Sequence, residues 1–378
     1  MRFILSLWLW AAVVGRALGV PQSSGFVGLD GNGSLVLQPV AGQQVLVDGV
    51  VFRALVQRVA QLEQQAQLLS GACTPVADNT TMAGLEGDDK KWHGGVLANN
   101  GKIYSIPYNS PSVLIIDPMT DTADTTTITG LNGLGKWFAG VLASNGKIYG
   151  IPQASPSVLI IDPATDTADY TTITVLEGDN KWVGGVLAHN GKIYGVPLNS
   201  PSVLIIDPAT NTTDINAISG LGGGGFKWAG GVLANNGKIY CMPQNSPSVL
   251  IIDPMTNTTD TISIAGVSGG GYWVFGGVLA NNGKIYSIPS RLASVLVIDP
   301  TTDTADSSTI TGLGSVTPGV FHWSGGVLAK NGKIYGIPYD SASVLIIDPA
   351  TDTADSTTIT GLEGANKWVG GVLANNGK

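Results

Sequence analysis

An all-β fold built from one repeated unit is predicted by three features of the sequence. A motif recurs along the chain, and its Asn-Gly turn returns at intervals of 45 to 49 residues. The 378 residues include 52 glycines and 20 prolines, but only 12% are charged, about half the usual share. No part of the repeated unit has the spacing of an amphipathic helix. The glycines of the recurring turn are Gly101, Gly146, Gly191, Gly237, Gly283, Gly332 and Gly377.

Each unit contains four short segments with strand character. The first two, Gly-Gly-Val-Leu-Ala and Lys-Ile-Tyr-x-Ile-Pro, are joined by Asn-Gly, which favours a tight hairpin. The third, Ser-Val-Leu-Ile-Ile-Asp, is typical of a strand buried on both faces, and Asp-Pro ends it. The Thr-rich Ala-Asp-x-Thr-Thr-Ile-Thr is the expected outer strand. This pattern predicts the blade of a β-propeller, and a flat β-solenoid is the alternative.

The repeat also resembles a known group of propellers. The run N-G-K-I-Y followed by V-L-I-I-D-P-A-T-D-T is similar to the kelch-like pattern, in which N-G-K-I-Y-V leads to Y-D-P-x-T-D-T-W. The resemblance covers most of every unit and implies four-stranded blades. The sequence diverges from kelch repeats where Ile-Pro replaces a double glycine and where residues such as Ala123 replace a tryptophan. The chain's own tryptophans are predicted to wedge between blades: Trp92, Trp137, Trp182, Trp228, Trp273, Trp323 and Trp368.

Propeller repeats are expected over residues 84–378. Six units are complete, and a seventh stops at Lys378, just after its Asn-Gly turn. Residues 80–87, Thr-Thr-Met-Ala-Gly-Leu-Glu-Gly, parallel residues 357–364 and resemble an outer strand without a blade of its own. A propeller ring closes in this way when both ends of the chain share one blade. We therefore predict a seven-bladed ring with its last blade truncated, and a six-bladed ring with an extra tail is the alternative.

Other patterns precede the repeats. Residues 1–19 have the basic start, apolar run and small-residue cleavage site of a secretory signal peptide, and the run is shorter than the ~20 residues of a membrane span. A short β-rich segment is expected over 20–50, and apolar residues at heptad spacing predict a helix over 51–70. This helix resembles the stalks of trimeric fibre proteins and predicts a homo-oligomer through residues 52–69; an amphipathic helix packed on the main domain is the alternative. Residues 71–83 are the expected linker and closing strand.

One face of the predicted propeller varies between units. In a blade of four antiparallel strands, the turns between strands two and three lie on the same face as the links between blades, and both differ from unit to unit. Loops on a rigid scaffold commonly carry recognition, so we expect this variable face to bind a ligand, with neutral drift as the alternative. The candidate ligand-binding residues are Tyr108, Asn109, Gln153, Asn199, Gln244, Asn245, Arg291, Tyr339 and Asp340.

Motifs for catalysis, metal binding or a cofactor are not found in the sequence. His93, His189 and His322 stand at different positions of the unit and do not have the spacing of metal ligands. The run Asp-Pro-Ala-Thr-Asp-Thr-Ala-Asp contains the carboxylates of a calcium loop but lacks its glycine and distal glutamate, so we predict turn capping instead. Cys241 replaces a small residue of the second strand and is predicted to be buried.

The net charge of −8 argues against nucleic acid or an anionic membrane as a partner. The expected function is that of a secreted, non-enzymatic propeller that binds a glycan or an extracellular protein. A structural cell-surface or cell-wall protein is one alternative. Another is a hydrolase or lyase that acts on polysaccharide in the axial funnel, for which carboxylates are available at Glu86, Glu177, Asp340 and Glu363.

Four N-glycosylation sequons fit a secretory route. They begin at Asn32, Asn79, Asn211 and Asn257.

Overall fold

The computed structural model describes residues 25–29, 35–39, 76–82, 85, 90–174, 176–267, 276–313 and 320–378. The chain divides into two compact units, Met1–Cys73 and Thr74–Lys378. In the first unit, β1 (Gly25–Leu29) and β2 (Leu35–Pro39) pair as an antiparallel hairpin. The signal peptide and the heptad helix predicted from the sequence lie outside the described residues.

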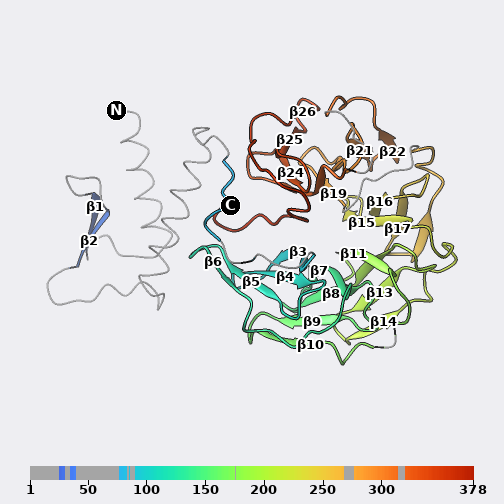
Figure 1. Ribbon diagram of the computed structural model, residues 1–378, viewed down its shortest axis with the longest axis horizontal. Helices are drawn as coiled ribbons and strands as arrows, with labels where there is room; N and C mark the ends of the chain where they lie inside the picture. Colours follow the sequence, from blue (N-terminus) through green and yellow to red (C-terminus); the bar gives the residue numbers. More distant parts are fainter. Residues whose placement is uncertain are drawn as a thin grey trace. The chain divides into compact units, whose positions relative to one another are not determined.

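The second unit contains six separate four-stranded antiparallel sheets, each built from four consecutive strands. Figure 1 shows them as blades around a common centre. The fold is therefore an all-β, six-bladed propeller, and the separate sheets exclude the β-solenoid alternative.

The strands of blades 1 to 3 are β3 (Trp92–Leu97), β4 (Ile103–Pro107), β5 (Leu114–Asp117), β6 (Thr122–Asp124), β7 (Trp137–Leu142), β8 (Ile148–Pro152), β9 (Leu159–Asp162), β10 (Thr167–Asp169), β11 (Trp182–Leu187), β12 (Ile193–Pro197), β13 (Leu204–Asp207) and β14 (Thr212–Asp214). Those of blades 4 to 6 are β15 (Trp228–Leu233), β16 (Ile239–Pro243), β17 (Leu250–Asp253), β18 (Thr258–Asp260), β19 (Gly277–Leu279), β20 (Ile285–Ser287), β21 (Leu296–Asp299), β22 (Thr304–Asp306), β23 (Trp323–Leu328), β24 (Ile334–Pro338), β25 (Leu345–Asp348) and β26 (Thr353–Asp355).

Apolar side chains fill the space between neighbouring blades. Tyr104 and Ile115 of blade 1 form one buried cluster with Trp137, Ile148 and Ile161 of blade 2. The same arrangement recurs between the following blades. The prediction that the tryptophans lie between blades is confirmed for Trp137, which is 2% exposed. Burial of this apolar surface is the main stabilising contribution to such a fold.

The innermost strands are crowded where the blades converge. A β-carbon added at Gly185 would lie 2.7 Å from Cδ1 of Ile151, and one at Gly184 would lie 3.0 Å from the Cα atom of Gly230 in the next blade. Gly184 also has a φ of +81°, in the left-handed region that favours glycine. The ladder changes register between Trp182 and Gly185. The glycine pair thus permits both a β-bulge and a close approach of two backbones.

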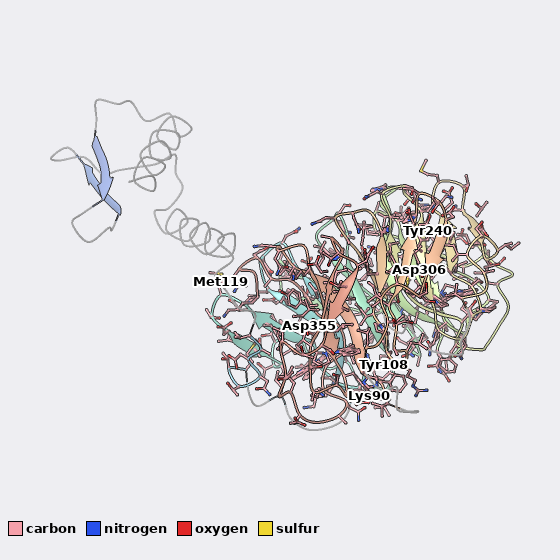
Figure 2. The ribbon with its side chains drawn as sticks, turned by 90° about the horizontal axis from the view of Figure 1, so that it is seen from above. Lys90, Tyr108, Met119, Tyr240, Asp306 and Asp355 are labelled. Atoms are coloured by element: carbon pink, nitrogen blue, oxygen red, sulfur yellow. The ribbon has the colours of Figure 1, made fainter. Side chains whose placement is uncertain are left out.

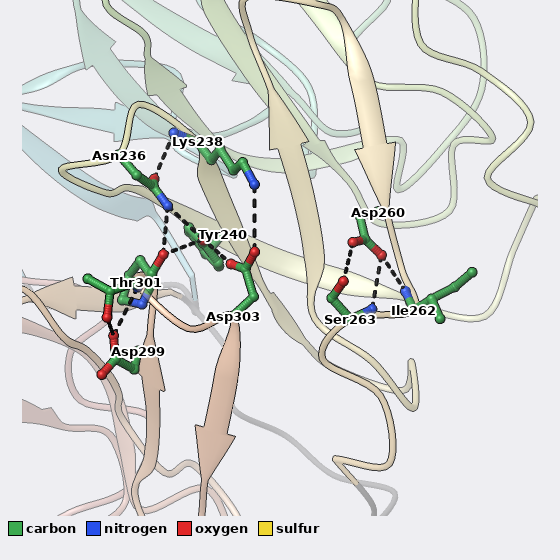
Figure 3. Close-up of polar contacts among 10 residues, drawn as sticks. Asn236, Lys238, Tyr240, Asp260, Ile262, Ser263, Asp299, Thr301 and Asp303 are labelled. Atoms are coloured by element: carbon green, nitrogen blue, oxygen red, sulfur yellow. Dashed lines mark hydrogen bonds and ion pairs between the residues drawn. The ribbon is translucent and has the colours of Figure 1, made fainter.

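Where the Asn-Gly turn of one blade meets the Asp-Pro turn of the next, a set of polar side chains joins the two blades. Between blades 4 and 5, Asn236 Nδ2 donates to the Tyr240 hydroxyl oxygen at 2.9 Å and to the Pro300 carbonyl at 2.8 Å (Figure 3). The Tyr240 hydroxyl donates to Asp303, which lies 3.6 Å from the Lys238 ammonium. We call this group the inter-blade polar contact. Its tyrosine pairs are Tyr104–Asp166, Tyr149–Asn211, Tyr194–Asn257, Tyr240–Asp303 and Tyr286–Asp352.

The outer strand is shorter than the sequence predicts. In blade 4 it is Thr258–Asp260, and the stretch after it is a turn rather than a strand. Asp260 Oδ1 accepts the backbone N–H groups of Ile262 and Ser263 at 2.7 and 3.0 Å (Figure 3). These N–H groups are then no longer available to a strand ladder, so the chain turns at the aspartate. Turn capping by this run of aspartates agrees with the sequence prediction.

The cysteine of the second strand is buried, as predicted. Cys241 is 0% exposed in β16, and burial raises the pKa of its thiol. Its role is therefore packing.

Residues 361–378 form no strand but contact the blades on either side. The Gly370 N–H donates to the Ser324 carbonyl of blade 6 at 2.9 Å, and the Gly94 N–H of blade 1 donates to the Val369 carbonyl at 3.3 Å. Figure 1 shows this segment between β24 and β3. These contacts do not establish a blade, and the seventh blade stays a prediction.

Replacing Tyr149 by Phe is expected to lower the free energy of unfolding by about 1–2 kcal/mol, because Asn145 and Asn211 each lose a hydrogen-bond partner at a buried hydroxyl. Tyr335 is the matched control, since among the described residues its hydroxyl is bonded only to Asn331. Tyr335→Phe is expected to cost less than about 0.5 kcal/mol. Urea denaturation measures both, and equal losses would show that the contact between blades adds nothing.

The aspartates that end the outer strands are expected to make the fold sensitive to acid. Hydrogen bonds from the following threonine or serine side chains and backbone N–H groups lower the pKa of Asp124, Asp306 and Asp355 from 3.8 to about 2. Their stabilising effect is therefore complete above about pH 5 and is lost as the pH falls through 3.8 toward 2. Melting temperatures at pH 5, 3 and 2 measure it. The triple Asp→Asn variant should show a shallower fall, and an unchanged fall would contradict this assignment.

Candidate functional site

The turns between the second and third strands lie beside the links between blades and form the variable face. The Lys136 N–H, in the link to blade 2, donates to the Tyr108 carbonyl of blade 1 at 3.1 Å, and the Gln153 N–H donates to the Lys136 carbonyl at 2.9 Å. Figure 2 shows Tyr108 and Lys90 together at the lower margin of the view, with Met119 of an Asp-Pro turn away from it. The grouping of turns expected from an antiparallel blade is therefore present.

Side chains from several blades meet on this face near the axis. The residue that follows each blade tryptophan is not constant, and three of these residues come together from blades 2, 3 and 4. Half-buried rings from a turn and a link pack against them. The buried cluster consists of Phe138, Val183, Leu198 and Ala229, and Tyr108, Ala139 and Phe321 pack against it.

His93 lies between two of these rings. Its ring centroid is 4.4 Å from those of both Tyr108 and Phe138. Neither ring nitrogen has a hydrogen-bond partner among the described residues, and the same holds for Oε1 of Gln153. Burial lowers the pKa of His93 to about 3, so its imidazole is neutral near pH 7 and offers one donor and one acceptor. Buried polar atoms of this kind normally have a partner, such as water or a ligand.

Three predicted site residues meet around Phe321 at the boundary of blades 5 and 6. The Arg291 guanidinium carbon lies 3.7 Å from the centroid of the Phe321 ring, and the Tyr339 ring centroid lies 6.0 Å from it. The Phe321 N–H donates to Asp340 Oδ2 at 3.0 Å. The buried Ser324 hydroxyl in the adjoining strand has no partner among the described residues. This group includes residue types, at Arg291, Asp340 and Ser324, that the corresponding positions of the other units do not share.

Several predicted site residues hold the links in place. Their side-chain atoms bond to backbone or side-chain atoms of a link, and this fixes the shape of the variable face rather than leaving those atoms free for a ligand. Gln244 is half-buried in the corresponding turn of blade 4. The contacts are Asn109 to Gly135, Gln153 to Asn180, Asn199 to Phe226, Asn245 to Gly225, and Asp340 to Asn366.

A buried lysine in the link is the feature that the sequence interpretation missed. Lys136 Nζ donates to the carbonyls of Tyr108, Ser110 and Gly133 at 3.0, 3.0 and 2.7 Å. The residue is 5% exposed, and burial lowers the pKa of its ammonium to about 8. Lys181 makes the same three contacts in the next link. We call this arrangement the lysine cage; it ties the turn of one blade to the link of the next.

The sequence signal for the lysine cage is the recurring Lys-Trp pair. The candidate site residues come from positions that vary between units, whereas this pair recurs in most units. Blades 5 and 6 depart from it, because Tyr272 stands before Trp273 and His322 before Trp323. Burial lowers the pKa of His322 below its ordinary value. The boundary of blades 5 and 6 therefore lacks the ammonium group that the other described links share. Lysines before tryptophan are Lys91, Lys136, Lys181, Lys227 and Lys367.

Two of the predicted glycosylation sites lie in the inter-blade polar contact. Asn211 and Asn257 occupy the positive-φ position of the Asp-Pro turn, each with a φ of +53°, where asparagine and aspartate are tolerated. Their Oδ1 atoms accept the hydroxyls of Tyr149 and Tyr194 at 2.8 and 3.0 Å. Asn79 is exposed, and Asn32 lies outside the described residues.

The described residues contain no cluster of three or more histidine, cysteine or acidic side chains that could hold a metal ion. Within the same part of the chain, no helix has the length and apolar character needed to cross a bilayer.

Comparison with known proteins supports the fold but not a family. No protein-family model matches the chain, and no curated protein sequence does. The kelch resemblance therefore stays a prediction.

Solved structures share the architecture at low sequence identity. A streptogramin B lyase matches with a TM-score of 0.62 and 13% identity, over 78% of this chain and 90% of that one. The virginiamycin B lyase of Staphylococcus aureus matches with a TM-score of 0.57 and 11% identity, over 74% and 87%. The extracellular domain of a one component system from B. thetaiotaomicron matches with a TM-score of 0.54 and 14% identity, over 76% and 38%. Identities this low show only that the fold is shared.

Replacing Lys136 by Met is expected to lower the free energy of unfolding by about 2–3 kcal/mol, because the buried carbonyls of the lysine cage lose a charged donor. Lys147 is the matched control: its ammonium is exposed and 3.5 Å from Asp162. Lys147→Met is expected to cost less than about 1 kcal/mol. Urea denaturation compares the two variants. Equal losses would remove the lysine cage as a stabilising contact.

Proposed function

We propose that this protein is a secreted, non-enzymatic recognition propeller whose variable face binds a neutral, hydroxyl-rich ligand such as a glycan. The observation that carries the proposal is the gathering of incompletely buried aromatic rings on this face. Tyr108, Phe321 and Tyr339 are half-buried in its turns and links, and Phe226 is 41% exposed. Aromatic faces of this kind stack on apolar ligand surfaces while neighbouring polar atoms hydrogen-bond.

The polar atoms beside these rings fit a neutral ligand. A neutral imidazole at His93, an amide oxygen at Gln153 and a hydroxyl at Ser324 are buried beneath this face without a partner among the described residues. A ligand therefore reaches them through an ordered water or after a side chain above them moves, and hydroxyl groups and water satisfy both donors and acceptors. The net charge of −8 disfavours an acidic ligand. The candidate binding group therefore consists of the cluster of Phe138, Val183, Leu198 and Ala229 with His93 and Tyr108, the group around Phe321, and the exposed ring of Phe226.

Secretion and oligomerisation are part of the proposal and rest on sequence. Residues 1–19 have the pattern of a signal peptide, and an extracellular domain is among the structures that share the fold. Self-association through residues 52–69 would bring several variable faces together, and linked weak sites gain avidity without new contacts.

An enzyme that acts on polysaccharide is the second candidate, because the variable face is not uniform. The boundary of blades 5 and 6 alone combines His322, Ser324, Arg291 and Asp340, and catalysis requires such an asymmetric group. Asp340, however, accepts backbone N–H groups of Phe321 and Asn366 with its two oxygens, which gives it a positioning role.

A glycan array with the full chain tests the binding proposal. Tyr339→Ser and Phe226→Asn are expected to weaken capture tenfold or more, since each removes a stacking surface, and asparagine tolerates the φ of +50° at position 226. Tyr170→Ser is the matched control, because this tyrosine is 43% exposed beyond the outer strand of blade 2. No capture of any glycan, or equal losses in all three variants, would refute the proposal. Turnover of a captured polysaccharide, abolished by Asp340→Asn, would favour the enzyme instead.

A further inference from the structure

The Asp-Pro turns of blades 3 and 4 differ from the others at two positions at once. Blades 1, 2, 5 and 6 have Asp-Thr-Ala at the end of this turn, whereas blades 3 and 4 have Asn-Thr-Thr, over residues 211–213 and 257–259. Neither change alone would create the Asn-x-Thr sequence that accepts an N-linked glycan. The aspartates that stand in place of the asparagine are Asp121, Asp166, Asp303 and Asp352.

Asn211 and Asn257 keep the contact with the preceding blade through their oxygen atoms. Each Oδ1 accepts a tyrosine hydroxyl, as Oδ1 of Asp303 accepts that of Tyr240. Asp303 Oδ2 lies instead 3.6 Å from the Lys238 ammonium. In an asparagine this second position belongs to Nδ2, because an amide has nitrogen in place of one carboxylate oxygen. The amide nitrogen is therefore not needed for the inter-blade polar contact.

The lysines that face these two asparagines pair with other residues. Lys147 lies 3.5 Å from Asp162, and Lys192 lies 3.8 Å from Asp207, in each case an aspartate of the lysine's own blade. Lys102, which faces an aspartate of the next blade, pairs with that residue across the boundary instead. Within the described part of the chain, Nδ2 of neither asparagine donates a hydrogen bond. Both amide nitrogens are thus left to solvent.

The other asparagine of the same contact has no hydrogen left for a substituent. Asn145 Nδ2 donates to the Tyr149 hydroxyl oxygen and to the Pro208 carbonyl, both at 3.0 Å. Asn190 makes the equivalent two bonds at the next boundary. A group attached to either of these nitrogens would break a bond between blades, whereas a group on Nδ2 of Asn211 would not.

The surface at the two turns is open. Asn257 is exposed, Asn211 is half-buried, and the threonine that follows each of them is exposed. Met119 of the equivalent turn in blade 1 lies away from Tyr108 of the variable face (Figure 2). A bulky group on these turns therefore has room, and it stays clear of the face to which we assign ligand binding.

We propose that Asn211 and Asn257 carry N-linked glycans. The proposal rests on the secretion that is part of the proposed function, because the donor, an oligosaccharide linked to a polyprenyl diphosphate, is met on the secretory route. In the transfer, a bond forms between Nδ2 and the first carbon of the sugar, and the bond from that carbon to the diphosphate oxygen breaks. Nδ2 loses one proton, and the polyprenyl diphosphate leaves. Oδ1 stays available to the tyrosine hydroxyl, so the modified chain keeps the contact between blades.

Glycans at these positions divide the surface of the propeller by function. Blades 3 and 4 are neighbours, and a bulky, soluble group on each of them shields their Asp-Pro turns from contact with another protein. The variable face stays open for its ligand.

Expression of the full chain in cells that perform N-glycosylation tests the proposal. Peptide-N-glycosidase F releases the glycan and converts the asparagine to aspartate, and mass spectrometry of peptides locates the conversion. Conversion at residues 211 and 257 is expected in most molecules and only after treatment with the enzyme. The treated protein should stay folded, because four other blades have aspartate at this position. Unmodified asparagine at either position overturns the assignment of that site.

A second chain, led by an unrelated cleavable signal peptide, separates this proposal from the proposed secretion. Failure of residues 1–19 to direct export contradicts the secretion, whereas export of the second chain without glycans at residues 211 and 257 overturns the present proposal.

Matched variants assign the modification to the two turns. Thr213→Ala and Thr259→Ala introduce the alanine of the other blades, and each should remove one step of the shift in electrophoretic mobility. Asp303→Asn with Ala305→Thr builds the same sequence in blade 5 and should add one step, whereas Asp303→Asn alone should add none. An unchanged shift in both alanine variants, or no added step in blade 5, contradicts the proposal. Capture on the glycan array reports on the variable face separately, so either proposal can fail without the other.

Discussion

The structure depends on one constraint: a blade of this protein cannot bury its own apolar faces. Each four-stranded sheet is covered by the next, and the tyrosine of the second strand is fully buried only where a following blade exists. The inter-blade polar contact adds direction to this packing, since the Asn-Tyr pair of one blade fits the Pro-Asp turn of the next. The regular spacing of the repeat follows from this requirement, because every unit must present the same face to its neighbour.

The two faces of the propeller differ in what their side chains are used for. On one rim, the second asparagine of the Asn-Gly turn and the tyrosine after it bond to the Asp-Pro turn of the next blade, while the aspartate before the proline and the threonines of that turn bond within the turn itself. On the other rim, the lysine cage holds the backbone of the links through main-chain carbonyls. The aromatic rings and polar side-chain atoms near the axis are positioned by this backbone and take no part in the cage. A scaffold that fixes its loops through main-chain contacts can change the side chains at the axis at little cost to stability, which suits recognition.

The boundary of blades 5 and 6 departs from this plan in a consistent way. His322 replaces the lysine of the cage, Arg291 lies over Phe321, and Asp340 binds the backbone of two links. These differences make the variable face asymmetric at this boundary despite the near-identity of the units.

The sequence by itself determined the repeat, its four-strand composition, the hairpin turns and the grouping of turns on two faces, because these follow from local patterns of glycine, proline and β-branched residues. It placed the outer strand too late, since only the folded chain shows Asp260 capturing the N–H groups that a longer strand would use. Tertiary structure also decided that Asn109, Asn199 and Asp340 hold links, and that His93 lies between two rings. Such roles depend on contacts between different blades, and a linear pattern cannot specify which side chains those contacts will leave without a partner.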